Sequence, residues 1–384
     1  MLIKNGVIHT MDGPVIANGF VQISKGKILS VGPMERCPEE SGDVLDARGG
    51  HVMPGYIDAH CHLGMFGDGL GFEADDGNES TDPCTPHLRA VDAVNPLDRC
   101  FSEGRAAGVT TVLTGPGSAN PVSGQFAAVK TNGCWVDEMV LRAPVAMKMA
   151  LGENPKSVYN ERHETPVTRM ATAAIIRENL AKAQEYRERL ERAQADPDED
   201  KPDFDAKLDA LQPVLKGEIP VHIHAHRADD IATALRVSRE FGLRCVIVHG
   251  TEGHRIAELL AREKVPVITG PCLGDRCKPE LVNMTLENPA ILAGAGVEIA
   301  ICTDHPETPV QYLPICAAMA VRGGLEPEQA LAAITINAAR IAGLDGRLGS
   351  LTPGKDADIV VTDGYPLDWL SRTIAVYIDG KSVT

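Results

Sequence analysis

The chain has 384 residues, of which 43% are hydrophobic and 23% charged, and its formal net charge is −16 at pH 7. This balance is typical of a globular protein and excludes a disordered chain or a fibrous repeat. The negative charge repels phosphate backbones and anionic lipid surfaces, so nucleic acids and membranes are not expected as partners. Aromatic residues make up only 4%, so the core must consist mainly of Val, Ile, Leu and Ala, as in α/β proteins with a buried parallel sheet.

The beginning of the chain alternates like short strands separated by turn residues, and the same pattern returns near its end. We expect these strands at 2–10, 19–24, 27–31, 357–362 and 374–379. They predict a composite β-sandwich domain built from residues 1–53 plus 343–384. The ten cysteines show no CxxC spacing, and we find neither a leader-like start nor an apolar run of about 20 residues. We therefore expect a cytoplasmic protein without a disulfide framework.

The middle of the chain alternates short apolar runs with stretches of helical periodicity. Strands are expected at 55–60, 108–113, 145–150, 221–225, 245–249, 265–269 and 297–303, with a weaker eighth at 125–131. Helices are expected between them, for example over 96–107, 228–241 and 255–263. This alternation predicts an α/β fold with a (β/α)8 TIM-like barrel over residues 54–342. The long connection 165–216 contains helices and no strand, so the 145–150 strand should precede the 221–225 strand in the barrel.

Histidines and one aspartate end several of these strands. His60 and His62 end the first barrel strand, and His224, His249 and Asp304 end later ones. The carboxyl ends of barrel strands meet at the mouth where such enzymes place their catalytic groups. One HxH pair is a weak signal, but imidazoles and a carboxylate that converge in this way predict a divalent metal. Zn²⁺ suits these ligands, and Mn²⁺, Fe²⁺ or Ni²⁺ are alternatives.

Lys148 lies inside the apolar strand 145–150, where an ammonium group is costly to bury. It has two interpretations. In the first, it extends its charge to solvent or pairs with an acid such as Glu153. In the second, burial deprotonates its amine, which reacts with CO₂ to form a carbamate that bridges two metals.

The sequence resembles the metal-dependent amidohydrolase superfamily nearly from end to end. The motifs that carry this resemblance are Val52–His62, Ile301–Asp304 and Gly349–Val361. Within the superfamily, 78–83, His224–His226 and Val248–Gly250 resemble the imidazolonepropionase-like branch, and the stretch 136–153 is similar to the region around the carboxylated lysine of isoaspartyl dipeptidases.

The resemblance implies the hydrolysis of a C–N bond in an amide, a dipeptide-like compound or a cyclic amide by a metal-bridged hydroxide. It implies two metals, most simply Zn²⁺, of which one is held by His60, His62 and Asp304 and the other by His224 and His249. N6-carboxylated Lys148 would bridge them, and Glu153 is a rival bridge. Asp304 would also transfer the proton during catalysis, and His226, two residues after His224, would contact the substrate or an oxyanion.

Further substrate contacts are expected from four residues near strand ends or in the long loop after the first barrel strand: Arg89, Arg227, His254 and His305. The partner is a small-molecule substrate, and self-association into a homo-oligomer is expected. Two alternative functions remain: a deaminase or lactonase on the same scaffold, and a non-catalytic scaffold related to dihydropyrimidinase. The second is disfavoured because every ligand position is filled.

Overall fold

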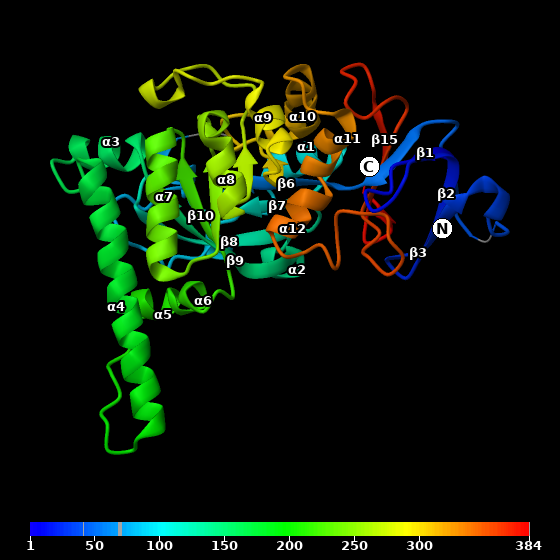
Figure 1. Ribbon diagram of the computed structural model, residues 1–384. Helices are drawn as coiled ribbons and strands as arrows, with labels where there is room; N and C mark the ends of the chain where they lie inside the picture. Colours follow the sequence, from blue (N-terminus) through cyan, green and yellow to red (C-terminus); the bar gives the residue numbers. More distant parts are fainter. Residues whose placement is uncertain (41, 68–70, 384) are drawn as a thin grey trace.

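The computed structural model describes residues 1–40, 42–67 and 71–383, and its strands form two sheets. The terminal sheet joins the two ends of the chain in the order β16-β15-β14-β5-β1-β2-β3, with β4 also paired to β1. Its strands are β1 (Leu2–Ile8), β2 (Ile16–Ser24), β3 (Lys27–Pro33), β4 (Val44–Asp46), β5 (His51–Pro54), β14 (Ile359–Thr362), β15 (Thr373–Ile378) and β16 (Lys381–Ser382). β14 runs antiparallel to β5, so the last strands lie beside the first at one end of the molecule (Figure 1). The sandwich expected from the sequence stays a prediction.

The barrel sheet has eight strands in the order β6 to β13. They are β6 (Tyr56–Cys61), β7 (Val109–Thr114), β8 (Val122–Lys130), β9 (Val140–Ala150), β10 (Val221–Ala225), β11 (Cys245–His249), β12 (Val267–Thr269) and β13 (Ile299–Ile301). At the two edges, the amide of Asp304 donates to the carbonyl of His60 (3.1 Å) and the amide of His62 to the carbonyl of His305 (2.9 Å). These bonds draw β6 and β13 together, so the sheet is a nearly closed barrel. As predicted, β9 pairs directly with β10.

The prediction that strands and helices alternate regularly along the barrel is wrong at β8. This strand runs antiparallel to both neighbours, with Thr111 of β7 opposite Lys130 and Met149 of β9 opposite Val122. Only a short loop separates β7 from β8, and a parallel neighbour would need a longer crossover connection. The barrel is therefore not a uniform (β/α)8 repeat, although Lys148 still lies on its fourth strand.

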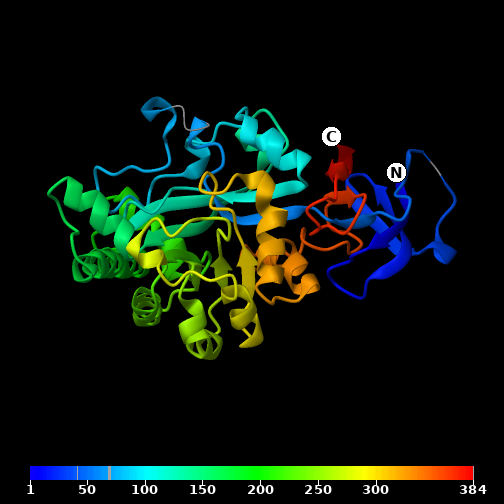
Figure 2. The same ribbon diagram turned by 90° about the horizontal axis from the view of Figure 1, so that it is seen from above.

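Helices cover the outside of the other strands (Figure 2). The α-helices are α1 (Arg99–Ala106), α2 (Val136–Met139), α3 (Glu153–Glu161), α4 (Arg169–Ala195), α5 (Ala206–Ala210), α6 (Gln212–Leu215), α7 (Ala228–Phe241), α8 (Ala257–Glu263), α9 (Asn288–Gly294), α10 (Leu313–Arg322), α11 (Pro327–Ala333) and α12 (Ile336–Ile341). The 3-10 helices are η1 (Met34–Arg36), η3 (Phe72–Ala74), η4 (Ala90–Asp92), η5 (Gly253–Ile256), η6 (Pro279–Leu281) and η7 (Val310–Tyr312). Within the described ranges, we find no helix with the length and apolar character that crossing a bilayer requires.

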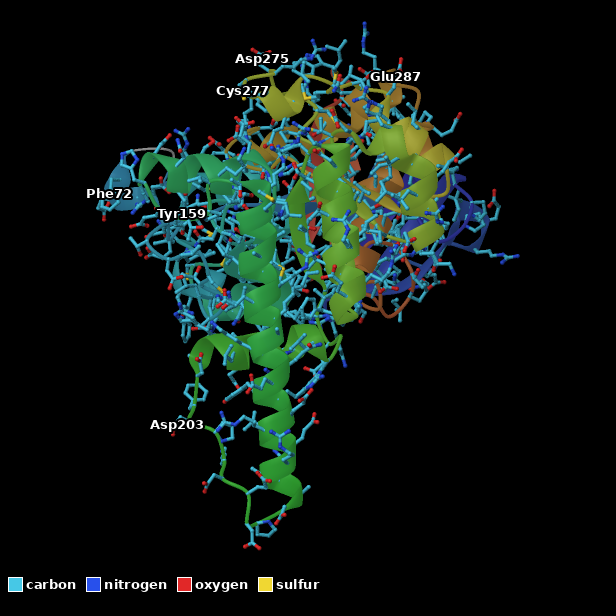
Figure 3. All side chains as sticks on the ribbon, turned by 60° about the vertical axis from the view of Figure 1, so that its left-hand side comes forward. Phe72, Tyr159, Asp203, Asp275, Cys277 and Glu287 are labelled. Atoms are coloured by element: carbon cyan, nitrogen blue, oxygen red, sulfur yellow. The ribbon has the colours of Figure 1, made fainter. Side chains whose placement is uncertain are left out.

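The connection between β9 and β10 projects from the body of the molecule as an arm. Helix α4 is its longest part, and the chain that returns from the tip passes Asp203 before it re-enters the body at α5 (Figure 3). The sequence predicted this arm as helices about a polar turn. It leaves the barrel sheet uninterrupted.

Candidate metal centre

Four strand ends bring imidazole and carboxylate groups together at one end of the barrel. Two sets of residues are close enough to hold an ion, with the candidate ligand atoms of each set within 4.8 Å of one another. They are the His60 group (His60, His62 and Asp304) and the His224 group (His224, His226 and His249). All five histidines are buried. Five of the six metal ligands expected from the sequence, all except Lys148, thus lie in the two sets, and His226 joins them.

Hydrogen bonds orient four of these imidazole rings. The Nδ1 atoms lie 2.6 Å from the Gly115 carbonyl (His62), 2.7 Å from the Gly270 carbonyl (His249), 2.9 Å from Ser118 Oγ (His224) and 2.7 Å from Thr251 Oγ1 (His226). A carbonyl oxygen only accepts, so Nδ1 of His62 and of His249 carries a proton, and Nε2 is the nitrogen of each ring that can bind a metal. This arrangement is the one that fixes a histidine for metal binding through Nε2.

Asp304 connects the two groups. Its Oδ1 lies 3.4 Å from Nε2 of His60 and 3.3 Å from Nε2 of His62, and its Oδ2 lies 3.9 Å from Nε2 of His249. Ligand atoms around a tetrahedral ion with bonds of about 2.0–2.2 Å are about 3.3–3.6 Å apart. The spacing within the His60 group therefore fits an ion between the three side chains.

The backbone is strained at two of these residues. His249 has φ 71° and Asp304 has φ 52°, a region that residues with a Cβ rarely adopt. His249 is the last residue of β11, and Asp304 follows the end of β13. Strain of this kind costs about 1–3 kcal/mol and is concentrated at functional sites.

The protonation states suit cation binding. Burial is the main cause that holds the pKa of His60, His224 and His226 well below the usual value, and it lowers the pKa of His249 to about 4. Burial raises the pKa of Asp304, but its histidine neighbours more than offset this, and the net pKa lies well below the usual value. Neutral imidazoles and an ionised carboxylate are the forms in which these side chains bind metals.

Lys148 lies at the bottom of the same site. It is fully buried, and its Nζ is 3.1 Å from Nε2 of His60. Burial is the main cause that lowers the pKa of its amine to about 8. At pH 7 about a tenth of the amine is then neutral, far more than for an ordinary lysine, and the neutral amine is the form that reacts with CO₂.

The two glutamates near the site have different surroundings. Glu153 begins helix α3, and its carboxylate lies 3.4 Å from the amide of Glu280. Glu280, in η6 after β12, is 1% exposed, and its Oε1 lies 3.8 Å from Nε2 of His224 and 3.7 Å from Nε2 of His226. Sequence analysis missed Glu280. Its segment has no regular pattern, and the only available signal was an acid in a loop that follows a barrel strand.

A cavity of about 420 Å³, the central cavity, opens over both groups. Its wall includes His62, His224, His226 and Asp304, together with Asn78 and Phe66 from the long loop after β6. Among the described residues that line it, Lys278 is the cationic side chain. Its Nζ donates to Oδ1 of Asn154 (2.9 Å). Sequence analysis missed Lys278 as well.

The four other residues that were expected to contact the substrate lie away from the central cavity. Arg227 forms a two-bond ion pair with Asp229 on the surface, and Arg89 lines a separate cavity of about 540 Å³. His254 is half-buried in η5, and its amide donates to Oδ1 of Asn288. Nδ1 of His305 accepts from the amide of Val310 (3.3 Å). None of the four is among the described residues that line the central cavity.

A family comparison gives this arrangement an identity. The model of the amidohydrolase family matches residues 51–383, which include the whole barrel sheet and both groups. The chain belongs to the amidohydrolase family. The enzymes of this family are hydrolases that act on C–N bonds and generally require divalent metals, so the resemblance seen in the sequence is confirmed.

Individual relatives agree with the family. This amidohydrolase is 30% identical to amidohydrolase tasK of Hapsidospora irregularis over 95% of its own length but spans only 40% of that protein. It is 27% identical to the imidazolonepropionase of Maricaulis maris, with 93% of this chain and 91% of the relative covered. An adenine deaminase of Clostridium botulinum is 24% identical, with 100% of this chain and 57% of the relative covered. The structure of an amidohydrolase from Thermotoga maritima matches with a TM-score of 0.96 and 44% identity over 100% of this chain and 99% of that one.

Proposed function

We propose that this amidohydrolase hydrolyses a C–N bond in a small amide, dipeptide-like or cyclic amide substrate bound in the central cavity. In this proposal one divalent ion is held by His60, His62 and Asp304 and a second by His224 and His249. N6-carboxylated Lys148 would be the bridging ligand. The observation that carries the proposal is the pair of adjacent groups of histidines, one of them with a carboxylate, at the bottom of an open cavity.

The fit of a divalent ion rests on the donor set. Nε2 of His224 is buried and has no hydrogen-bond partner among the described residues, and such an atom is costly unless something occupies the space before it. Zn²⁺ and Mn²⁺ both accept imidazole and carboxylate ligands. A bound ion would polarise the scissile carbonyl and acidify a water molecule.

The protein's own groups then move the proton and orient the substrate. Asp304, ionised and turned into the cavity, accepts a proton from the attacking water and returns it to the leaving nitrogen. His226 lies at the cavity wall and is the nearest imidazole outside the five expected ligands to stabilise the substrate oxygen. Lys278 stands at the same wall and would pair with a substrate carboxylate. These contacts favour an N-acyl amino acid or a dipeptide as substrate.

Bridging by Lys148 is favoured over bridging by Glu153. The lysine amine adjoins His60, whereas the Glu153 carboxylate turns to the amide of Glu280.

Deamination is the second candidate, because the adenine deaminase relative matches along the whole of this chain. The test is a screen of the Zn²⁺- and Mn²⁺-loaded protein against N-acyl amino acids, dipeptides including β-aspartyl ones, cyclic amides and adenine. Turnover of an amide or dipeptide supports the proposal. Ammonia release from adenine without any amide hydrolysis would replace it with deamination.

The remaining expectations are part of the same proposal. We propose that residues 1–53 plus 343–384 form a β-sandwich domain that flanks the 54–342 barrel, and that the protein forms a homo-oligomer. The cytoplasmic location stays a prediction.

A further inference from the structure

Glu280 is a buried carboxylate to which the proposed ligand set gives no role. Its Oε2 accepts a hydrogen bond from the amide of Glu153 (2.9 Å). Its Oε1 is buried and has no hydrogen-bond partner in the described part of the chain. A buried carboxylate oxygen without a partner costs considerable free energy, so a positive group is expected opposite it.

The unpartnered oxygen faces two imidazole nitrogens of the His224 group. The separations of 3.8 Å from His224 Nε2 and 3.7 Å from His226 Nε2 are too long for hydrogen bonds. They are close to the separation of about 3.3–3.6 Å expected between two ligands of one tetrahedral ion. Oε1 of Glu280 and Nε2 of His224, both buried and without a hydrogen-bond partner among the described residues, thus lie with Nε2 of His226 around a point that an ion would fill.

The other contacts of His224, His226 and Glu280 place no group at the point between their three facing atoms. Nδ1 of His224 is engaged by Ser118 and Nδ1 of His226 by Thr251, which turns both Nε2 atoms toward Glu280. Lys278 is the nearest cationic side chain, but its Nζ lies 3.9 Å from Oε1 and already donates to Asn154. Neither the two imidazole rings nor Lys278 donates a hydrogen bond to Oε1 of Glu280.

We propose that Glu280 is a metal ligand and that, together with His224 and His226, it binds a divalent transition metal ion such as Zn²⁺ or Mn²⁺. The inference rests on the proposed function and changes its second site by adding a carboxylate from the loop after β12 and by assigning His226 to the ion in place of the substrate oxygen. Because Lys278 and Leu281 of this loop line the central cavity, an ion at Glu280 ties one wall of the substrate site to the metal centre.

The test measures ion content and coordination in the full chain. Wild type and Glu280→Gln are equilibrated with Zn²⁺, dialysed and analysed by mass spectrometry, and the Co²⁺-loaded forms are compared by visible absorption. Wild type is expected to hold about two ions per chain. Glu280→Gln is expected to lose one of them, through an affinity at least about 100-fold weaker, and to show a changed Co²⁺ spectrum. Glu287→Gln, an exposed residue farther along the chain (Figure 3), is the matched control and should keep both ions.

Glu280→Asp provides a second arm, because it keeps the charge but withdraws the oxygen by one methylene group. It should also weaken the binding of one ion. Thermal melting of the metal-free forms verifies that both variants fold. Ion content, affinity and Co²⁺ spectrum equal to wild type in both variants would overturn the inference alone. A wild-type chain that binds no divalent ion would instead overturn the proposed function.

Discussion

The amine of Lys148 lies 3.1 Å from Nε2 of His60, a metal-ligand candidate on a strand that is three positions away in the barrel order. Both side chains are fully buried. An ammonium group beside a ring nitrogen in this setting is unfavourable, whereas a carbamate on the same nitrogen would supply the oxygens that two adjacent ions need. This contact motivates the first prediction.

Replacing Lys148 with Ala should lower the ion content below that of wild type and reduce turnover, because the bridging group is lost. Glu153→Ala should retain its ions, since the Glu153 carboxylate lies beside the Glu280 amide. Metal analysis after dialysis distinguishes the two. Added acetate or propionate should partly restore ion binding to Lys148→Ala by placing a carboxylate in the vacated space. Full ion content and full activity in Lys148→Ala would show that the lysine is not the bridge.

Asp304→Asn should lower kcat by at least about 100-fold, because the amide cannot accept the proton of the attacking water. The His224 group does not depend on this carboxylate for its own ring contacts, so at least one ion should remain. Steady-state kinetics and metal analysis on the same preparations separate the two effects. Asp345→Asn, an exposed position outside the site, serves as control. A fully active Asp304→Asn enzyme contradicts the proposed role.

Lys278→Met should raise KM about 10- to 100-fold for substrates with a free carboxylate and leave kcat nearly unchanged. A charged hydrogen bond of this kind contributes about 1.5–3 kcal/mol, and its loss affects binding uniformly. Arg227→Ala should leave KM unchanged, because Arg227 is paired with Asp229. The comparison uses an N-acyl amino acid and its amide. The opposite pattern, with KM raised only in Arg227→Ala, would show that Arg227 and not Lys278 binds the substrate carboxylate.

Gly270→Ala should reduce both stability and ion content. Gly270 has φ 126°, and a Cβ there would lie 2.5 Å from the carbonyl oxygen of Cys302, so the backbone must move at a cost of about 1–3 kcal/mol. The moving carbonyl is the acceptor that orients His249. Urea unfolding and metal analysis measure the two effects. Gly274→Ala, in the same loop with open space around its Cβ, should behave as wild type, and equal behaviour of the two variants would refute this reasoning.

The terminal sheet should contribute to acid sensitivity through His51. Burial, and then the neighbouring His9, lower the pKa of His51 below its usual value near 6.5, and the two rings lie 2.8 Å apart at His9 Nε2 and His51 Nδ1. The folded state therefore keeps this ring neutral while the unfolded chain takes up a proton. The free energy of unfolding should fall as the pH drops below about 6.5.

Urea unfolding of metal-free protein between pH 5.5 and pH 7.5 measures this effect. His51→Asn should show a smaller loss of stability at low pH than wild type, whereas the exposed His163→Asn should keep the wild-type dependence. The same pH dependence in all three proteins would exclude His51 as a source.

The sequence by itself predicted the barrel strands, the candidate ligand positions at their ends and the superfamily. These features rest on local patterns: apolar runs have definite ends, and side chains two residues apart on a strand point the same way, as in the HxH pair of His60 and His62. The carboxyl ends of the strands must then meet at one mouth. The buried Lys148 was also visible, because a lone amine in an apolar strand contradicts its surroundings.

Only the tertiary structure decided the rest. The antiparallel direction of β8 depends on the length of its connections, and the pairing of Arg227 with Asp229 depends on where the helix that follows begins. Glu280 and Lys278 lie in an irregular loop whose path is set by packing against distant strands, so no periodicity places their side chains. The scaffold could therefore be predicted from local regularity, but the carboxylate and the cation of this loop required long-range contacts to bring them to the histidines.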